Sequence, residues 1–195
     1  NPNQLLKTIQ ADEGNRNKGH LKIFFGYAAG VGKTYAMLEA AHMEKQQGID
    51  VVAGYVETHA RPKTAALLNG LEVLPTSEVL YNGMILNEFD IDMALKRKPQ
   101  LILVDELAHT NAEGCRHAKR YQDIKELLNA GIDVYTTVNV QHIESLCDTV
   151  ASITEIVVRE RIPDSLFDNA DQVELIDIEP QDLIDRLNTG NVYRQ

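Results

Sequence analysis

The fold is decided by the stretch Phe25-Gly26-Tyr27-Ala28-Ala29-Gly30-Val31-Gly32-Lys33-Thr34. A short apolar run, residues 21–25, precedes the glycines, and a run typical of a helix, residues 35–47, follows them. A glycine-rich turn between a strand and a helix is the setting of a phosphate-binding loop, because backbone N–H groups and the helix N-terminus then face anionic oxygens. The sequence therefore predicts a nucleotide-phosphate site at this turn.

The residues of the turn have different expected roles in this site. Gly30 and Gly32 allow the backbone to curl so that its N–H groups point inward. Lys33 would reach the β- and γ-phosphates, and Thr34 would offer its hydroxyl to Mg²⁺. The nucleotide-binding set predicted from this turn is Gly30, Val31, Gly32, Lys33 and Thr34, with Thr34 also a metal ligand.

One position departs from the usual pattern of a phosphate-binding loop. That pattern has its first glycine where this chain has Tyr27, whereas the glycine here is Gly26. The Gly-Val-Gly-Lys-Thr end, which contacts phosphate, is intact, so we expect only the entry to the loop to differ. The alternative is a glycine-rich turn that carries a surface lysine.

An apolar strand that ends in two carboxylates supports the nucleotide interpretation. Residues 101–104 read Leu-Ile-Leu-Val, and Asp105 and Glu106 follow them about 70 residues after the turn, as in a Walker B element. Asp105 would hold Mg²⁺ through its water shell, and Glu106 would act as a general base toward water or another hydroxyl. The alternative is an ordinary strand followed by a solvated acidic turn.

The order of the segments predicts an α/β fold with a doubly wound, mostly parallel sheet like that of P-loop NTPases. The unbroken apolar run 101–104 suggests burial on both faces of a sheet. Because Glu106 directly follows Asp105, we expect one strand, residues 133–138, to be inserted between the strands that carry the two motifs. Thr137 and Asn139, at its polar end, would then sense the γ-phosphate.

The other expected elements follow from apolar periodicity and turn residues. Further strands are expected at 50–56, 153–158 and 173–178, and a hairpin at 78–81 and 84–86 around Asn82-Gly83. Helices are expected at about 33–47, 61–69, 91–98, 121–130 and 141–150, and after Pro180.

Two arginines lie in loops that would rim the site. Arg61 follows the second strand, and Arg116 lies in the polar loop after Glu106. Either could stabilise charge that develops on a transferred phosphate. Ordinary loop hydrogen bonding is the alternative for each.

Composition excludes several classes of function. The net charge is −10, so we expect no direct binding to nucleic acid, which depends on phosphate contacts. The apolar runs are far too short to span a membrane, so we expect this fragment to make no membrane contact. The histidines show no zinc-ligand spacing, and the two cysteines, Cys115 and Cys147, lie far apart, as in a reduced protein.

The chain divides into a polar N-terminal extension, residues 1–18, and one nucleotide-binding domain, residues 19–195. A domain of that length can bury a sizeable core. The first residue is not Met, so we expect an excised piece of a longer protein.

The motifs resemble those of a known family, the N-terminal cytoplasmic domains of the osmosensitive, potassium-responsive KdpD sensor histidine kinases. The resemblance covers roughly residues 18–193, and its most specific strings are Asp-Glu-Leu-Ala-His and Thr-Val-Asn-Val-Gln-His. Further matching strings lie at 21–34, 56–59, 87–90, 104–111, 116–117, 119–124 and 136–142.

The resemblance implies a regulatory, ATP- and Mg²⁺-binding input domain of a two-component system that controls potassium-transport genes. The full protein would phosphorylate one of its own histidines and pass the phosphate to a response regulator. The implied location is the cytoplasmic side of the inner membrane, and the implied partners are the rest of the kinase and, through it, the regulator. The kinase core is not in this chain, and homodimerisation stays open.

Two other functions compete with the regulatory one. The domain could be an ATPase, or a kinase that phosphorylates a protein hydroxyl, with Glu106 as its base. It could instead be an interaction platform whose phosphate-binding loop is vestigial, in which case the acidic surface and the Asn82-Gly83 hairpin would contact partners.

Overall fold

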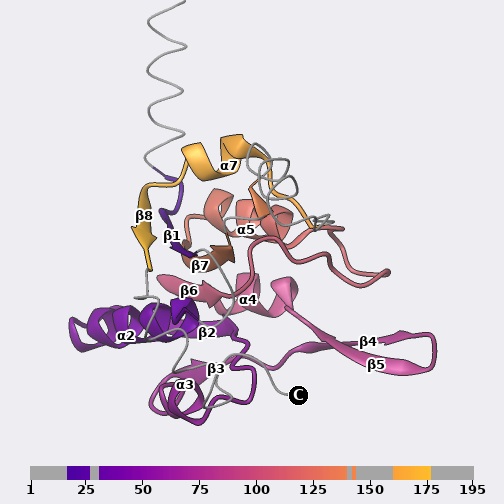
Figure 1. Cartoon of the computed structure of the whole chain (residues 1–195), viewed down its shortest axis with the longest axis horizontal. Helices are drawn as coiled ribbons and strands as arrows, with labels where there is room; N and C mark the ends of the chain where they lie inside the picture. The colour runs from indigo at the N-terminus through magenta and orange to yellow at the C-terminus, as the bar shows by residue number, and fades with distance from the viewer. Residues whose placement is uncertain (1–16, 27–30, 140–141, 144–159, 177–195) are drawn as a thin grey trace, which may run out of the picture.

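A computed structural model describes residues 17–26, 31–139, 142–143 and 160–176. Its centre is a sheet of six strands in the order β3-β2-β6-β7-β1-β8, in which every neighbouring pair is parallel (Figure 1). The strands are β1 (Leu21–Gly26), β2 (Val51–Tyr55), β3 (Glu72–Val73), β6 (Leu101–Val104), β7 (Asp133–Asn139) and β8 (Gln172–Leu175).

The predicted strand insertion is confirmed. Strand β7 pairs with β1 on one side and with β6 on the other. In the register of β1 and β7, Gly26 lies opposite Asn139. The ends of β1 and β7 and the Asp105-Glu106 pair after β6 therefore lie at one edge of the sheet, where parallel sheets bind ligands.

Helices cover both faces of the sheet, as a doubly wound fold requires. They are α2 (Lys33–Gln46), α3 (Pro62–Ala66), α4 (Ile91–Arg97), α5 (Arg120–Asn129) and α7 (Asp164–Asp168). Helix α2 packs on one face, where Met37 and Leu38 join the core, and helices α4, α5 and α7 contribute to the core on the other face.

The apolar run of β6 supplies both cores. Leu101 and Leu103 belong to the α2 side, whereas Ile102 and Val104 belong to the α5 side. Successive side chains of a strand point to opposite faces, so a strand covered on both faces has no polar position. The prediction from this run is confirmed.

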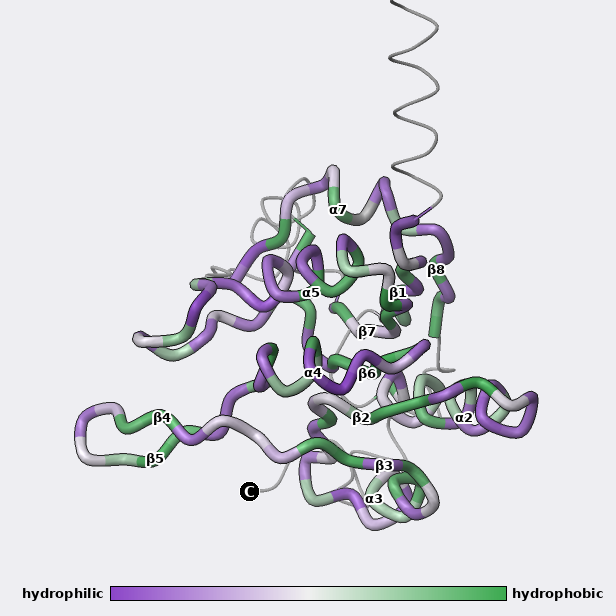
Figure 2. The backbone as a smooth tube through the Cα atoms, turned by 180° about the vertical axis from the view of Figure 1, so that it is seen from behind, coloured by the Kyte–Doolittle hydropathy of each residue, from purple (hydrophilic) through white to green (hydrophobic). Residues whose placement is uncertain are grey.

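The hairpin around Asn82-Gly83 is confirmed as β4 (Ser77–Tyr81) paired antiparallel with β5 (Met84–Glu88). Both turn residues have positive φ, 48° at Asn82 and 78° at Gly83, as a type I′ turn requires. The hairpin extends away from the sheet, and hydrophobic residues lie along both of its strands (Figures 1 and 2).

Some expected elements differ from the structure. The helix expected at 61–69 is shorter, because only 62–66 is helical and turns follow it. The two-residue strand β3 and the helix α7 were not predicted. Residues 1–16, 144–159 and 177–195 lie outside the described residues, and with them the predictions for 153–158, for the helix after Pro180 and for most of 141–150. None of the helices described is long and apolar enough to cross a membrane.

Candidate functional site

A pocket of about 210 Å³ opens at the carboxyl edge of the sheet. It brings together residues from the start of α2, the loop after β2, the loop after β6 and the end of β7. The predicted site residues that line it are Lys33, Thr34, Arg61, Asp105, Glu106, Thr137 and Asn139.

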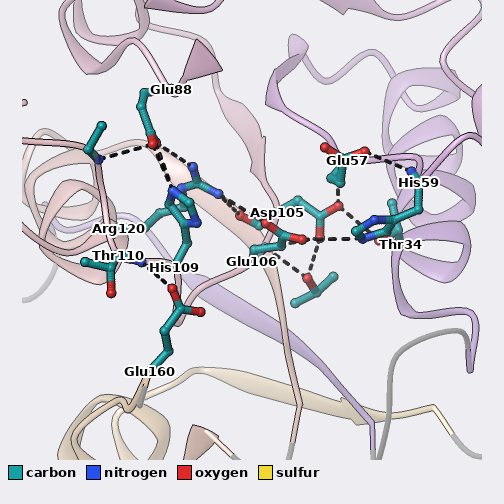
Figure 3. A network of polar contacts seen from close by, with 12 residues as sticks. Thr34, Glu57, His59, Glu88, Asp105, Glu106, His109, Thr110, Arg120 and Glu160 are labelled. Carbon is teal, nitrogen blue, oxygen red and sulfur yellow. Dashed lines mark hydrogen bonds and ion pairs between the residues drawn. The ribbon is translucent and has the colours of Figure 1, made fainter. Parts of the chain in front are cut away.

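Asp105 lines this pocket and is only 1% exposed (Figure 3). One carboxylate oxygen accepts a hydrogen bond from the hydroxyl of Thr34, at 3.0 Å, and another from the backbone N–H of Glu57, at 3.1 Å. The other oxygen accepts from the hydroxyl of Thr137. Burial raises the pKa of Asp105, although these hydrogen bonds oppose the shift. A cation next to Asp105 would offset this cost of burial.

The start of α2 carries the cation of the predicted phosphate site. Gly32, the residue before the helix, has φ +96°, a conformation that favours glycine. Lys33 lines the pocket, and burial lowers its pKa to about 8, while the negative charge of Asp105 opposes that shift. Val31 is buried, and Gly30 lies outside the described residues.

Glu106 stands beside Asp105 in a left-handed conformation, with φ +61°. Its backbone N–H lies 3.1 Å from the hydroxyl oxygen of Thr137 and donates to it. One carboxylate oxygen is 3.4 Å from Nε2 of His59, and this hydrogen bond lowers the pKa of Glu106 and raises that of His59. Glu106 is therefore an ionised hydrogen-bond acceptor on the pocket wall, as a general base must be.

The loop after β2 faces this carboxylate. His59 and Ala60 both have positive φ, 49° and 55°. Glu106 also has positive φ, and of these three non-glycine residues His59 and Glu106 line the pocket. Such conformations cluster at functional sites because the surrounding structure must hold them there. The same loop brings Arg61 to the pocket.

Asn139 offers the pocket an acceptor that has no partner in the described structure. Its Oδ1 atom is buried and makes no hydrogen bond there. Buried polar atoms are nearly always paired in native proteins, so an unpaired one on a pocket wall fits a ligand that donates to it. Together with the cations Lys33 and Arg61, it is a set that suits a polar, anionic ligand with hydroxyl or amino groups.

The structure does not bring Arg116 to the pocket, although Ala108 and His109 of the same loop line it. Its guanidinium pairs with Asp92 at 2.8 Å and with Glu126 at 3.0 Å. These partners lie on α4 and α5, so Arg116 ties the polar loop to two helices. Of the two arginines considered, only Arg61 lines the pocket.

Sequence reasoning missed Glu88 and Arg120, which are buried next to Glu106 and form a polar cluster with His109 of the pocket wall (Figure 3). Arg120 is 0% exposed, and its Nη1 donates to the carbonyl oxygen of Asp105 at 3.1 Å. Its Nη2 donates to Glu88 at 3.2 Å, and its guanidinium lies 4.1 Å from the ring centre of Tyr55. The available signal was Glu88 at the end of a hairpin strand that begins with the apolar run Met-Ile-Leu.

Comparison with known proteins shows the family to which this chain belongs. A family model described as KdpD, the osmosensitive K⁺ channel His kinase sensor domain, matches residues 17–195. The chain belongs to this KdpD sensor-domain family. Among its relatives, the sensor protein KdpD of Clostridium acetobutylicum is 62% identical over 194 residues, and that of Escherichia coli strain K12 is 57% identical over 192 residues.

The KdpD relatives are much longer than this chain. The two matches cover 100% and 98% of the chain but 22% and 21% of the relatives. A putative sensor protein KdpD of Synechocystis is 52% identical over 178 residues, which is 91% of the chain and 48% of that relative. The chain therefore spans about a fifth of the length of the first two KdpD proteins.

Proposed function

We propose that the domain binds ATP with Mg²⁺ in this pocket and serves as the nucleotide-dependent input domain of a two-component sensor histidine kinase. The observation that carries the proposal is the meeting of Thr34 and Asp105, 71 residues apart in sequence, through a hydrogen bond of 3.0 Å beside Lys33. A hydroxyl, a carboxylate and an ammonium at the N-terminus of a helix are what a magnesium-bound triphosphate requires.

Different residues would bind different parts of this ligand. The backbone of Gly30, Val31 and Gly32 and the ammonium of Lys33 would bind the phosphates, and Thr34 and Asp105 would bind the metal. Arg61 would add a second positive charge at the mouth of the pocket. In this arrangement Mg²⁺ would neutralise part of the triphosphate charge and lower the cost of burying Asp105.

Regulation requires that the bound nucleotide distinguish two states of the domain, since a ligand with equal affinity for both shifts nothing. Glu106, Thr137 and Asn139 line the pocket on the side of β6 and β7, where a γ-phosphate would contact them and a diphosphate would not. We infer that the remainder of the kinase receives this difference, and that it reaches a response regulator that controls potassium-transport genes. We also propose that the domain lies at the cytoplasmic side of a membrane.

Metal removal tests the proposal. Calorimetric titration with ATP should give an affinity that falls by about tenfold or more when EDTA replaces Mg²⁺, because the metal is the largest local charge in such a site. In Asp105→Asn this metal dependence should be lost. Asp92→Asn is the matched control, since that exposed carboxylate pairs with Arg116 away from the pocket. An affinity that ignores Mg²⁺ in the wild type would contradict the assigned metal site.

A second candidate function is catalysis by the domain itself, as an ATPase or a hydroxyl kinase. The ionised carboxylate of Glu106 on the pocket wall favours it. If the domain turns over ATP, Glu106→Gln should lower the rate by about 10²-fold or more while the affinity for Mg-ATP stays similar. Equal turnover in wild type and variant would rule out Glu106 as the base.

A third candidate is an interaction platform. The hairpin favours it, because Leu80, Met84 and Ile85 are 74%, 65% and 63% exposed. Failure of millimolar ATP to bind would favour this function over the other two.

A further inference from the structure

Glu88 is the residue at which the hairpin meets the pocket wall. It is the last residue of β5, and it is only 4% exposed although the rest of that strand is exposed or half-exposed. Its carboxylate lies 3.0 and 3.1 Å from Nε2 of His109 and accepts a hydrogen bond from Arg120 at 3.2 Å. It also accepts from the backbone N–H of Ala112 at 3.2 Å.

Both side-chain partners of Glu88 contact residues of the pocket wall. His109 lines the pocket, and the backbone N–H of His109 donates to the carbonyl oxygen of Glu106 at 3.0 Å. Arg120 donates to the carbonyl oxygen of Asp105, and its guanidinium is 3.8 Å from the carboxylate of Glu106. Two side chains, those of His109 and Arg120, therefore connect Glu88 to the pocket wall (Figure 3).

The burial of Arg120 makes this connection stiff. A guanidinium that is 0% exposed must keep its compensating partners, since losing one leaves a charge uncompensated in the interior. Glu88 and Glu106 share this single cation, at 3.2 and 3.8 Å. A movement of Glu106 toward or away from a ligand would therefore change the ion pairing of Arg120, and with it the contact between Arg120 and Glu88.

The hairpin is the kind of element that would respond to such a change. It is a separate two-stranded sheet, and an isolated pair of strands is only marginally stable in water. Its apolar residues are largely exposed, so little core packing fixes it. The polar contacts of Glu88, together with the buried Leu74 and Phe89 that flank the hairpin, hold its base in place.

We propose that Glu88 is a positioning residue that, through Arg120 and His109, couples the occupant of the pocket to the stability of the β4–β5 hairpin. The hairpin is then the element that changes when the ligand changes. This inference rests on the proposed function, because it takes Mg-ATP as the occupant.

Amide hydrogen exchange of residues 77–88, with and without Mg-ATP, tests the coupling. In the wild type, Mg-ATP should change the exchange rate of the hairpin by about threefold or more, because local opening reports the contacts that hold a segment. In Glu88→Gln the domain should still bind Mg-ATP but the hairpin should no longer respond. Glu78→Gln, an exposed glutamate of the same hairpin, is the matched control and should respond like the wild type.

Three outcomes would overturn the inference. A wild type that binds Mg-ATP while its hairpin exchanges at the same rate shows that the pocket and hairpin are uncoupled, and leaves the proposed function intact. A full response in Glu88→Gln shows that Glu88 is not the link. Loss of the response in Glu78→Gln as well shows that any change in hairpin charge removes it. If Glu88→Gln does not fold, His109→Gln is the second variant. It removes the contact of the half-buried His109 with Glu88, and the change in hairpin exchange on addition of Mg-ATP should then be smaller than in the wild type.

A double-mutant cycle measured in the absence of ligand separates this inference from the proposed function. Glu106→Gln should alter hairpin exchange in the wild-type background and not in the Glu88→Gln background, since coupled residues give non-additive effects. If Mg-ATP does not bind, the proposed function fails and this cycle alone decides whether pocket wall and hairpin are linked. Additive effects would overturn the linkage.

Discussion

Gly26 has no room for a side chain. A Cβ atom there would lie 2.6 Å from Cγ2 of Val31 and 3.0 Å from Cδ of Lys33. The strand β1 therefore ends in glycine so that the chain can fold back with Lys33 against it.

Gly26→Ala should lower the affinity for Mg-ATP, because the added methyl group displaces Val31 and Lys33. We expect a loss of about tenfold or more, since small misplacements of a binding group are costly. Calorimetric titration of a variant that keeps its native circular dichroism measures the effect. Unchanged affinity would show that the approach of Lys33 to Gly26 is not needed for binding.

The site residues that could be identified from the sequence are those that lie in short local motifs. Asp105 and Glu106 were recognisable because they end an apolar strand, and Lys33 and Thr34 because they follow glycines. Glu88 and Arg120 were not, since their pairing joins residues 32 positions apart that share no motif. Arg116 was misplaced for the opposite reason, because its loop is near the site in sequence while its side chain pairs with α4 and α5.

At the scale of elements, helix α4 begins with a side-chain cap. The carboxylate of Asp90 accepts a hydrogen bond from the backbone N–H of Met93 at 3.1 Å, which satisfies one of the unpaired donors at the start of the helix. This cap sets the start of the helix that follows the hairpin.

Asp90→Ala should lower the free energy of unfolding by about 1 kcal/mol, whereas Asp90→Asn should retain most of it, because asparagine also caps helices. Urea denaturation of the three proteins measures the difference. An equal loss in both variants would mean that the charge of Asp90, and not its cap, provides the stability.

Elements were predictable where their pattern was long or their turn distinctive. The strand order β6-β7-β1 followed from two adjacent carboxylates, and the hairpin followed from Asn82-Gly83. Strand β3 was not predictable, since a strand of two exposed residues, Glu72 and Val73, has no periodicity. It exists because β2 offers it an edge with which to pair.

At the scale of the whole molecule, polar contacts of Asp171 join the start of the edge strand β8 to the start of β1. Asp171, just before β8, accepts a hydrogen bond from the backbone N–H of Leu21 at 2.7 Å, and its other oxygen lies 3.2 Å from Nδ1 of His20. The hydrogen bond and the charge of Asp171 raise the pKa of His20.

The stability of the domain should therefore fall slightly as pH rises from about 6 to 8. The folded state binds the proton of His20 more tightly than the unfolded state, so this stabilisation is present below the ordinary pKa and is lost above the raised one. His20 is exposed, so we expect the effect to be below about 1 kcal/mol. The difference in unfolding free energy between wild type and His20→Gln, measured at both pH values, should shrink at pH 8, and a constant difference would contradict it.

The central claim is that the pocket at the carboxyl edge of the sheet binds Mg-ATP. The most direct measurement is calorimetric titration of the wild type and of Lys33→Ala with Mg-ATP and with Mg-ADP. We predict binding that distinguishes the two nucleotides and weakens by about tenfold or more in Lys33→Ala, as expected for loss of a charged hydrogen bond. Absence of binding to the wild type, or equal affinity in the variant, would contradict the account.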